Sequence, residues 1–100
     1  EELVIENIYN FPNPMKNETN FMFNIGGLAP PDNFKIRIYT VSGRLIKELE
    51  YPVSIGFNQI PWDGKDMDGD LIANGTYLYK VVMEGNTSNE SLVQKLVMLK

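Results

Sequence analysis

The 100-residue sequence contains no cysteine and no histidine. The absence of Cys excludes disulfide frameworks, thiolate metal sites and cysteine nucleophiles. The absence of His removes the usual general base at neutral pH and the commonest metal ligand. Together the two absences argue against catalysis within this chain. They favour a structural or interaction domain that needs no cofactor.

Positive charge is also scarce, since 9 Lys and Arg stand against 13 Asp and Glu for a net charge of −4. Proteins that bind nucleic acids or anionic membranes carry the opposite balance. No apolar run approaches the ~20 residues that cross a bilayer. The chain opens with Glu1-Glu2 and has neither a signal segment nor an initiating Met. We therefore expect no nucleic-acid partner, no membrane insertion, and a piece of a longer protein.

Apolar side chains recur with a period of two, which is typical of strands half-buried against one core. The strand-like runs are Leu3–Tyr9, Phe21–Ile25, Phe34–Tyr39, Leu45–Leu49, Phe57–Trp62, Thr76–Glu84 and Leu92–Leu99. Turn-forming pairs such as Asp63-Gly64, Asn74-Gly75 and Gly85-Asn86 separate them. This pattern predicts one all-β domain over residues 1–100, a seven-stranded immunoglobulin-like antiparallel β-sandwich.

Without a disulfide, the core of such a sandwich must be built from large apolar side chains. The predicted core residues are Phe21, Phe23, Ile36, Ile38, Trp62, Tyr77, Tyr79 and Val81. Among them, Trp62 and Tyr77 are the expected aromatic anchors. Gly75 is the expected turn residue in front of Tyr77.

Acidic residues cluster in the segment Asp63–Asp70. Clustered carboxylates are typical Ca²⁺ ligands, but the segment does not fit the EF-hand spacing. Asp66, Asp68 and Asp70 remain candidates for a site of another kind, whereas Asp-Gly pairs equally produce tight, solvated turns. The turn interpretation is favoured, and a glycosidase pair is disfavoured because all these carboxylates lie on one short loop.

The last expected strand, Leu92–Leu99, is apolar on both faces and is interrupted by Lys95 and followed by Lys100. One interpretation is a core strand on which lysines prevent edge-to-edge aggregation. The other is a recognition strand that a second protein binds, with Lys95 and Lys100 as recognition residues.

Several ordered motifs resemble a known family. They are Tyr9-Asn10-Phe11-Pro12-Asn13-Pro14, the strand pair within Phe34–Leu49, Trp62-Asp63-Gly64, Asn74-Gly75-Thr76-Tyr77 and the closing Lys95–Lys100. In this order they resemble the C-terminal domains of type IX secretion substrates, especially the domain that ends gingipain-type sortase peptidases. The middle section also resembles the immunoglobulin-like domain of the flagellar hook-capping protein FlgD.

This resemblance implies a seven-stranded sorting domain that is not itself an enzyme. Its implied partners are the secretion translocon or sortase components and an upstream domain of the same chain. The implied route runs through the periplasm to the outer-membrane surface or the medium, and the implied parent is a cysteine peptidase. The alternative is a structural FlgD-like sandwich packed in cis on a catalytic or adhesive domain. A carbohydrate-binding module, with Trp62 and Tyr51 as its aromatic candidates, is a third interpretation.

Overall fold

The computed structural model describes residues 3–84 and 89–100, and at Glu84 and residues 89–92 it describes the backbone alone. In these ranges the chain forms seven strands and no helix, so no described helix could cross a membrane. The strands are β1 (Val4–Phe11), β2 (Thr19–Gly26), β3 (Asn33–Thr40), β4 (Leu45–Glu50), β5 (Gly56–Trp62), β6 (Gly75–Glu84) and β7 (Asn89–Met98). The predicted fold class is confirmed. The expected Gly85-Asn86 turn lies outside the described residues.

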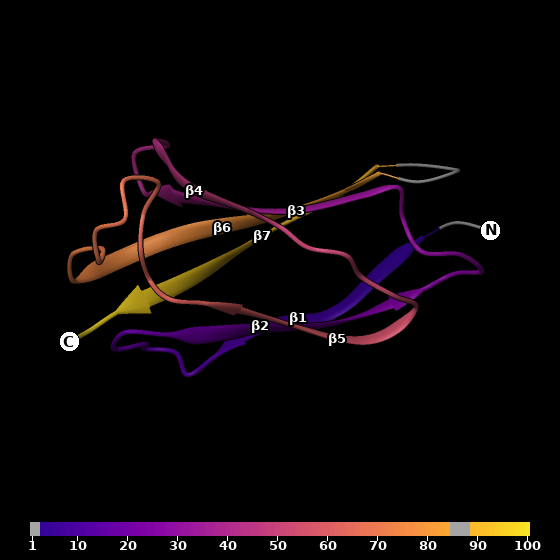
Figure 1. Cartoon of the computed structure of the whole chain (residues 1–100), viewed down its shortest axis with the longest axis horizontal. Helices are drawn as coiled ribbons and strands as arrows, with labels where there is room; N and C mark the ends of the chain where they lie inside the picture. The colour runs from indigo at the N-terminus through magenta and orange to yellow at the C-terminus, as the bar shows by residue number, and fades with distance from the viewer. Residues whose placement is uncertain (1–2, 85–88) are drawn as a thin grey trace.

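The strands form two antiparallel sheets that face each other (Figure 1). One has the order β1-β2-β5 and the other β4-β3-β6-β7. The chain changes sheet between β2 and β3, between β4 and β5, and between β5 and β6, which gives an immunoglobulin-like arrangement. The sandwich is elongated, with extents of 41 × 23 × 19 Å.

The core lies between the sheets, where the inward-facing side chains of the strands meet. All eight residues predicted for the core are buried. Phe21 of β2 contacts the ring of Tyr79 of β6 edge-on, with centroids 4.8 Å apart, and also stacks on Trp62 at 6.3 Å. The Phe21–Tyr79 pair joins the two sheets, and such ring contacts stabilise the fold beyond the burial of their area.

The strands at the sheet edges carry features that discourage pairing with a further strand. β1 is bent by an irregularity between Glu6 and Tyr9, where Asn7 has a positive φ of 58°. β5 contains Pro61, and β4 carries the charged residues Lys47, Glu48 and Glu50. Bulges, prolines and charges of this kind protect edge strands from aggregation.

The outer face of the four-stranded sheet is charged. Arg37 on β3 donates from Nε to Glu48 Oε1 on β4 at 3.0 Å, and Lys35 Nζ lies 3.7 Å from the same carboxylate. The hydrogen bond that Arg37 donates to Glu48 raises the pKa of Arg37 above its ordinary value. Lys80 on β6 and Lys95 on β7 continue this face across the sheet. Exposed pairs like these contribute about 0–1 kcal/mol each.

Candidate recognition site at the C-terminal strand

Strand β7 is an edge strand that pairs with β6 over its whole length, from Glu84 opposite Asn89 to Gly75 opposite Met98. Leu96 and Met98 are fully buried, while Val93 is 60% exposed. Because side chains alternate across a strand, Val93 and Lys95 face outward from the sheet. The strand is therefore a core element on one face and an accessible surface on the other. The side chain of Leu92 lies outside the described part.

The free edge of β7 is already occupied near its C-terminal end. The Met15 N–H donates to Val97 O and the Met15 carbonyl accepts from the Leu99 N–H, both at 2.8 Å. The Asn13 side chain adds to this contact, because its Oδ1 accepts from the Val97 N–H at 2.9 Å. Along this part of its edge, the expected recognition strand therefore has no free backbone groups to offer a second protein. The segment between β1 and β2 fills this part of the edge.

The two predicted recognition lysines lie on different parts of the surface. Lys95 is exposed on the outer face of the four-stranded sheet, opposite Leu78 of β6. Lys100 follows the end of β7, where its backbone N–H donates to Asn74 Oδ1 at 2.9 Å. Lys95 thus belongs to the charged sheet face, and Lys100 to the corner that leads into β6.

This corner is held by the predicted structural residues Gly75 and Tyr77. Gly75 has a positive φ of 148°, a backbone region that residues with a Cβ rarely adopt. Tyr77 is buried, and its hydroxyl donates to the Ala73 carbonyl at 2.7 Å. A tyrosine bonded to the backbone a few residues upstream is the tyrosine corner of immunoglobulin-like sandwiches. The corner fixes the start of β6, and through Asn74 it also fixes the end of the chain.

The acidic segment is an ordered turn. Asp66 Oδ1 accepts the N–H groups of Asp68 at 2.9 Å and Asp70 at 3.0 Å. The Met67 N–H donates to Ile46 O at 2.9 Å and so ties the turn to β4. Among the described residues, no group of three acidic side chains is placed to hold a metal ion. The carboxylate of Asp66 is engaged by backbone donors, which is the chemistry of a turn.

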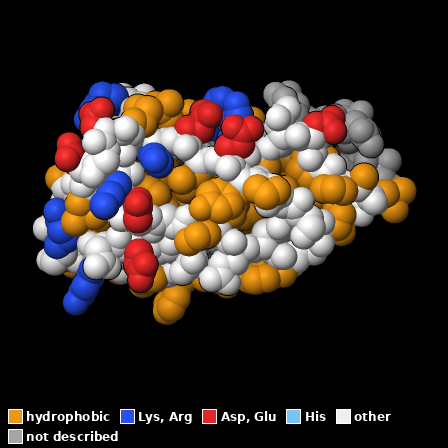
Figure 2. Space-filling model, viewed as in Figure 1, with side chains coloured by type: hydrophobic (Ala, Val, Ile, Leu, Met, Phe, Trp, Pro, Cys, Tyr) orange, Lys and Arg blue, Asp and Glu red, His pale blue; other side chains and the backbone are white. Residues whose placement is uncertain are grey.

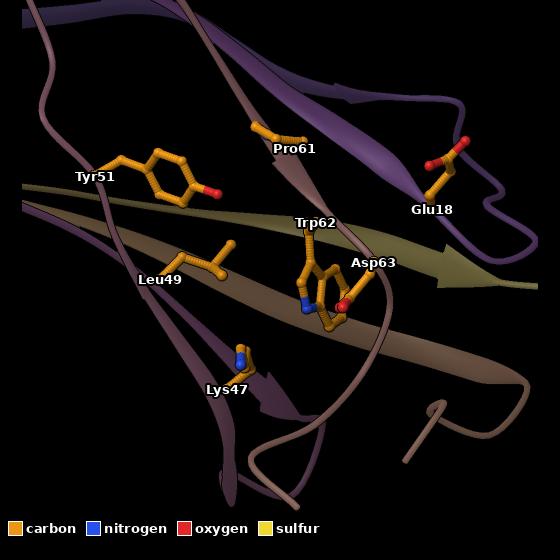
Figure 3. Close-up of a pocket in the computed structure, with 7 residues that line it drawn as sticks. All are labelled: Glu18, Lys47, Leu49, Tyr51, Pro61, Trp62 and Asp63. Carbon is orange, nitrogen blue, oxygen red and sulfur yellow. The ribbon is translucent and has the colours of Figure 1, made fainter. Parts of the chain in front are cut away.

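A cleft of about 340 Å³ opens between β4 and β5 (Figure 3). Its lining residues are Glu18, Lys47, Leu49, Tyr51, Pro61, Trp62 and Asp63. Trp62 is only 3% exposed, and its Nε1–H donates to Lys65 O at 3.1 Å. A ring this buried cannot serve as a stacking platform for a sugar. Figure 2, which views the molecule from this side, shows apolar side chains along the middle of the surface.

The contacts of Asn13 and Met15 with the free edge of β7, which we call the clamp on β7, were not predicted from the sequence. The clamp depends on a network in which Asn13 Nδ2 donates to Asn10 Oδ1 at 3.3 Å and Asn10 Nδ2 donates to Thr19 Oγ1 at 3.2 Å. Thr19 in turn donates to Pro12 O at 2.9 Å. The motif that could have indicated this clamp is Asn10-Phe11-Pro12-Asn13-Pro14. In it, side-chain amides that can bond the backbone stand close to prolines, which lack a backbone N–H.

The fold is shared with several solved structures. The chain superposes on dimeric latent PorU from Porphyromonas gingivalis with a TM-score of 0.81 and 24% identity, covering 99% of this chain and 10% of that one. PorZ of the same organism, described as an essential surface component of the type IX secretion system, gives a TM-score of 0.58 and 22% identity over 93% of this chain and 11% of PorZ. FlgD from Xanthomonas campestris gives 0.61 and 18%, over 95% of this chain and 67% of FlgD.

Sequence comparison points to one family. The chain shares 57% identity with the C5a peptidase of Streptococcus pyogenes over 28 residues, which are 28% of this chain and 2% of that protein. The chain thus spans a small fraction of the curated relatives that it matches. Residues 13–88, which include the acidic turn and the tyrosine corner, match the FlgD Ig-like domain family. The chain belongs to the FlgD Ig-like domain family.

Proposed function

We propose that this domain is a non-catalytic sorting module of a type IX secretion system, recognised by the outer-membrane translocon or by sortase components. The observation that carries the proposal is the position of β7, a sheet-edge strand with Val93 and Lys95 exposed on its outer face. The fold similarity to PorU and PorZ supports it. Its destination would be the outer-membrane surface or the medium, reached through the periplasm.

The recognised surface in this proposal is the exposed face of β7 together with Lys100, and not the backbone edge that Met15 fills. Lys95 offers an ammonium group on a sheet face that already carries Lys80 and Arg37. A receptor would therefore contact this strand with carboxylates or carbonyl oxygens, since an ammonium group only donates hydrogen bonds.

The proposal is tested by fusing residues 1–100 behind a periplasmic reporter in a type IX-competent bacterium. We expect the reporter to reach the cell surface or the medium. The variant Lys95→Ala with Lys100→Ala should leave the reporter in the periplasm, because it removes the two proposed recognition groups. These exposed changes alter the stability by only about 0.5 kcal/mol, so retention would report lost recognition and not unfolding. The matched control is Arg44→Ala with Lys65→Ala, which removes the same charge at other exposed positions. Retention of the unmodified fusion would instead favour the structural module packed in cis.

A further inference from the structure

The outer face of the three-stranded sheet differs in chemistry from the rest of the surface. It consists of the outward-facing side of β1, β2 and β5. Its residues are Val4, Glu6, Tyr9, Phe11, Asn20, Met22, Asn24, Gly26, Phe57, Gln59 and Pro61. We call this set the aromatic face. Glu6 is its one charged residue, whereas the opposite face of the sandwich carries several cations and carboxylates.

The large side chains of the aromatic face are unusually accessible. Phe11 is 65% exposed, Phe57 58% and Tyr9 49%. The register places Tyr9 beside Met22 in one row of the sheet, and Phe11 beside Asn20 and Pro61 in the next. Enrichment in aromatic residues and Met, together with depletion of charge, is typical of the centre of a protein–protein interface. Phe57 lies in a third row, opposite Asn24, so the exposed rings stand on one side of the sheet among mostly neutral polar residues. Exposed apolar side chains with a polar rim mark an interaction site.

The size of the aromatic face limits what can cover it. Its eleven residues are fewer than the ~20–30 that each partner contributes to a standard stable complex. A second copy of the chain would have to bind from free solution through this small surface. A tethered partner needs far less contact, because a short connection supplies an effective concentration in the millimolar range.

The chain itself indicates where such a tether would lie. Val4, the first residue of β1, belongs to the aromatic face, and Leu3 before it is already buried. A domain joined ahead of Leu3 would therefore meet the sandwich at the end of this face where Val4 lies opposite Gly26. The matching segments of PorU and PorZ make up 10% and 11% of those chains. We propose that the aromatic face packs against an uncharged apolar patch on the domain that precedes it in the same polypeptide. This inference rests on the proposed role as a module of a longer protein.

Hydroxyl-radical footprinting of the full-length polypeptide that contains this domain tests the proposal with matched residues. Tyr9 on the face is compared with Tyr51 outside it, which is 40% exposed. From these exposures alone, Tyr9 should oxidise at least as fast as Tyr51. If the preceding domain covers the face, we expect Tyr9 to oxidise several-fold more slowly than Tyr51.

A variant assigns the protection to the face. Phe11→Ser with Phe57→Ser should raise the oxidation rate of Tyr9 to that of Tyr51, while Leu28→Ser with Val41→Ser, at apolar positions that are at least as exposed, should not. If the first variant fails to fold, the wild-type ratio of Tyr9 to Tyr51 still decides.

Two results would overturn the proposal. The first is a Tyr9 rate equal to or above that of Tyr51 in the unmodified polypeptide, which would mean that the face is open to solvent. The second is protection that disappears on tenfold dilution, which would identify a second molecule as the occupant. The export assay is independent, because its reporter replaces the preceding domain. The sorting role and the docking face can therefore fail separately.

Discussion

At the scale of single residues, Trp62 shows how a conspicuous side chain acquires a structural role. It lines the β4–β5 cleft together with Tyr51, yet its ring is buried and its indole N–H donates to Lys65 O. The alternation Ile60-Pro61-Trp62 already indicates an inward direction. The hydrogen bond to the following turn could not be predicted from that alternation.

Trp62→Ala should lower the free energy of unfolding by about 3–5 kcal/mol, a large part of a typical total of about 5–15 kcal/mol. Tyr51→Ala, in the same cleft but 40% exposed, should cost much less. Chemical denaturation of both variants measures the difference. Equal midpoints for Trp62→Ala and the unmodified domain would show that the ring is not a core anchor.

Asp66 gives a second test at this scale. Asp66→Ala removes the acceptor for two backbone N–H groups, so it should destabilise the domain by about 1–2 kcal/mol. Asp68→Ala, at an exposed side chain of the same turn, should change the stability by about 0.5 kcal/mol at most.

Millimolar Ca²⁺ should leave thermal unfolding unchanged. A site filled at 100 times its dissociation constant would add about 2.7 kcal/mol, and a rise of that size would establish a calcium site.

Tyr79 predicts an alkaline limit to stability. Burial raises its pKa from 10.0 to about 12, since the charged phenolate is poorly solvated in the core. The folded state therefore binds the phenolic proton more tightly than the unfolded state. Its stabilising effect is complete below pH 10 and is lost as the pH rises toward 12. Urea unfolding at pH 8 and pH 11.5 measures this loss, and Tyr79→Phe should flatten the pH dependence. An unchanged slope in Tyr79→Phe would contradict the assignment.

At the scale of elements, the strands and their inward faces could be predicted because each depends on a local pattern. The run Phe57–Trp62 differs from β5 by one residue, since Gly56 extends the pairing. The clamp on β7 could not be predicted, because Met15 meets Met98 across 83 positions in a single parallel bridge. The sequence also could not predict that Lys95 and Lys100 lie on different parts of the surface. Their separation depends on where β7 ends, at Met98, and not on their spacing in the sequence.

Asn13→Ala should loosen this clamp without dissolving the sheet. It removes the acceptor of the Val97 N–H, whereas Leu96 and Met98 remain paired with β6. We therefore expect faster hydrogen exchange at the Val97 amide and little change at the amides of Leu96 and Met98, because local opening exposes only the outer edge. Equal acceleration at all three amides would indicate that the whole strand detaches.

At the scale of the molecule, the sandwich has two faces of opposite character, one charged and one aromatic, on either side of a common core. A single alternating pattern predicts which side of a strand is buried, but not which neighbours share its outer side. The charged face could be assembled only once β3 was known to lie between β4 and β6. For the same reason the aromatic face, drawn from β1, β2 and β5, was not visible in the sequence.

The elongated shape also has a mechanical consequence. β1 begins near one end of the long axis and β7 ends near the other (Figure 1). Ladder hydrogen bonds run perpendicular to the strands, so a pull on the two ends of the chain would load the bonds of β1 and β7 together, in shear. A pull between Val4 and Gly26, which face each other at one end of the β1–β2 ladder, would open it bond by bond.

Because the chain has no Cys of its own, single cysteines can be introduced as attachment points for optical tweezers. We expect a distinctly higher unfolding force for the end-to-end pull, and equal forces would contradict this expectation. Under the proposed sorting role, a translocon that pulled on one end of this domain would meet an elongated, mechanically resistant fold, which is more readily transported folded than unfolded.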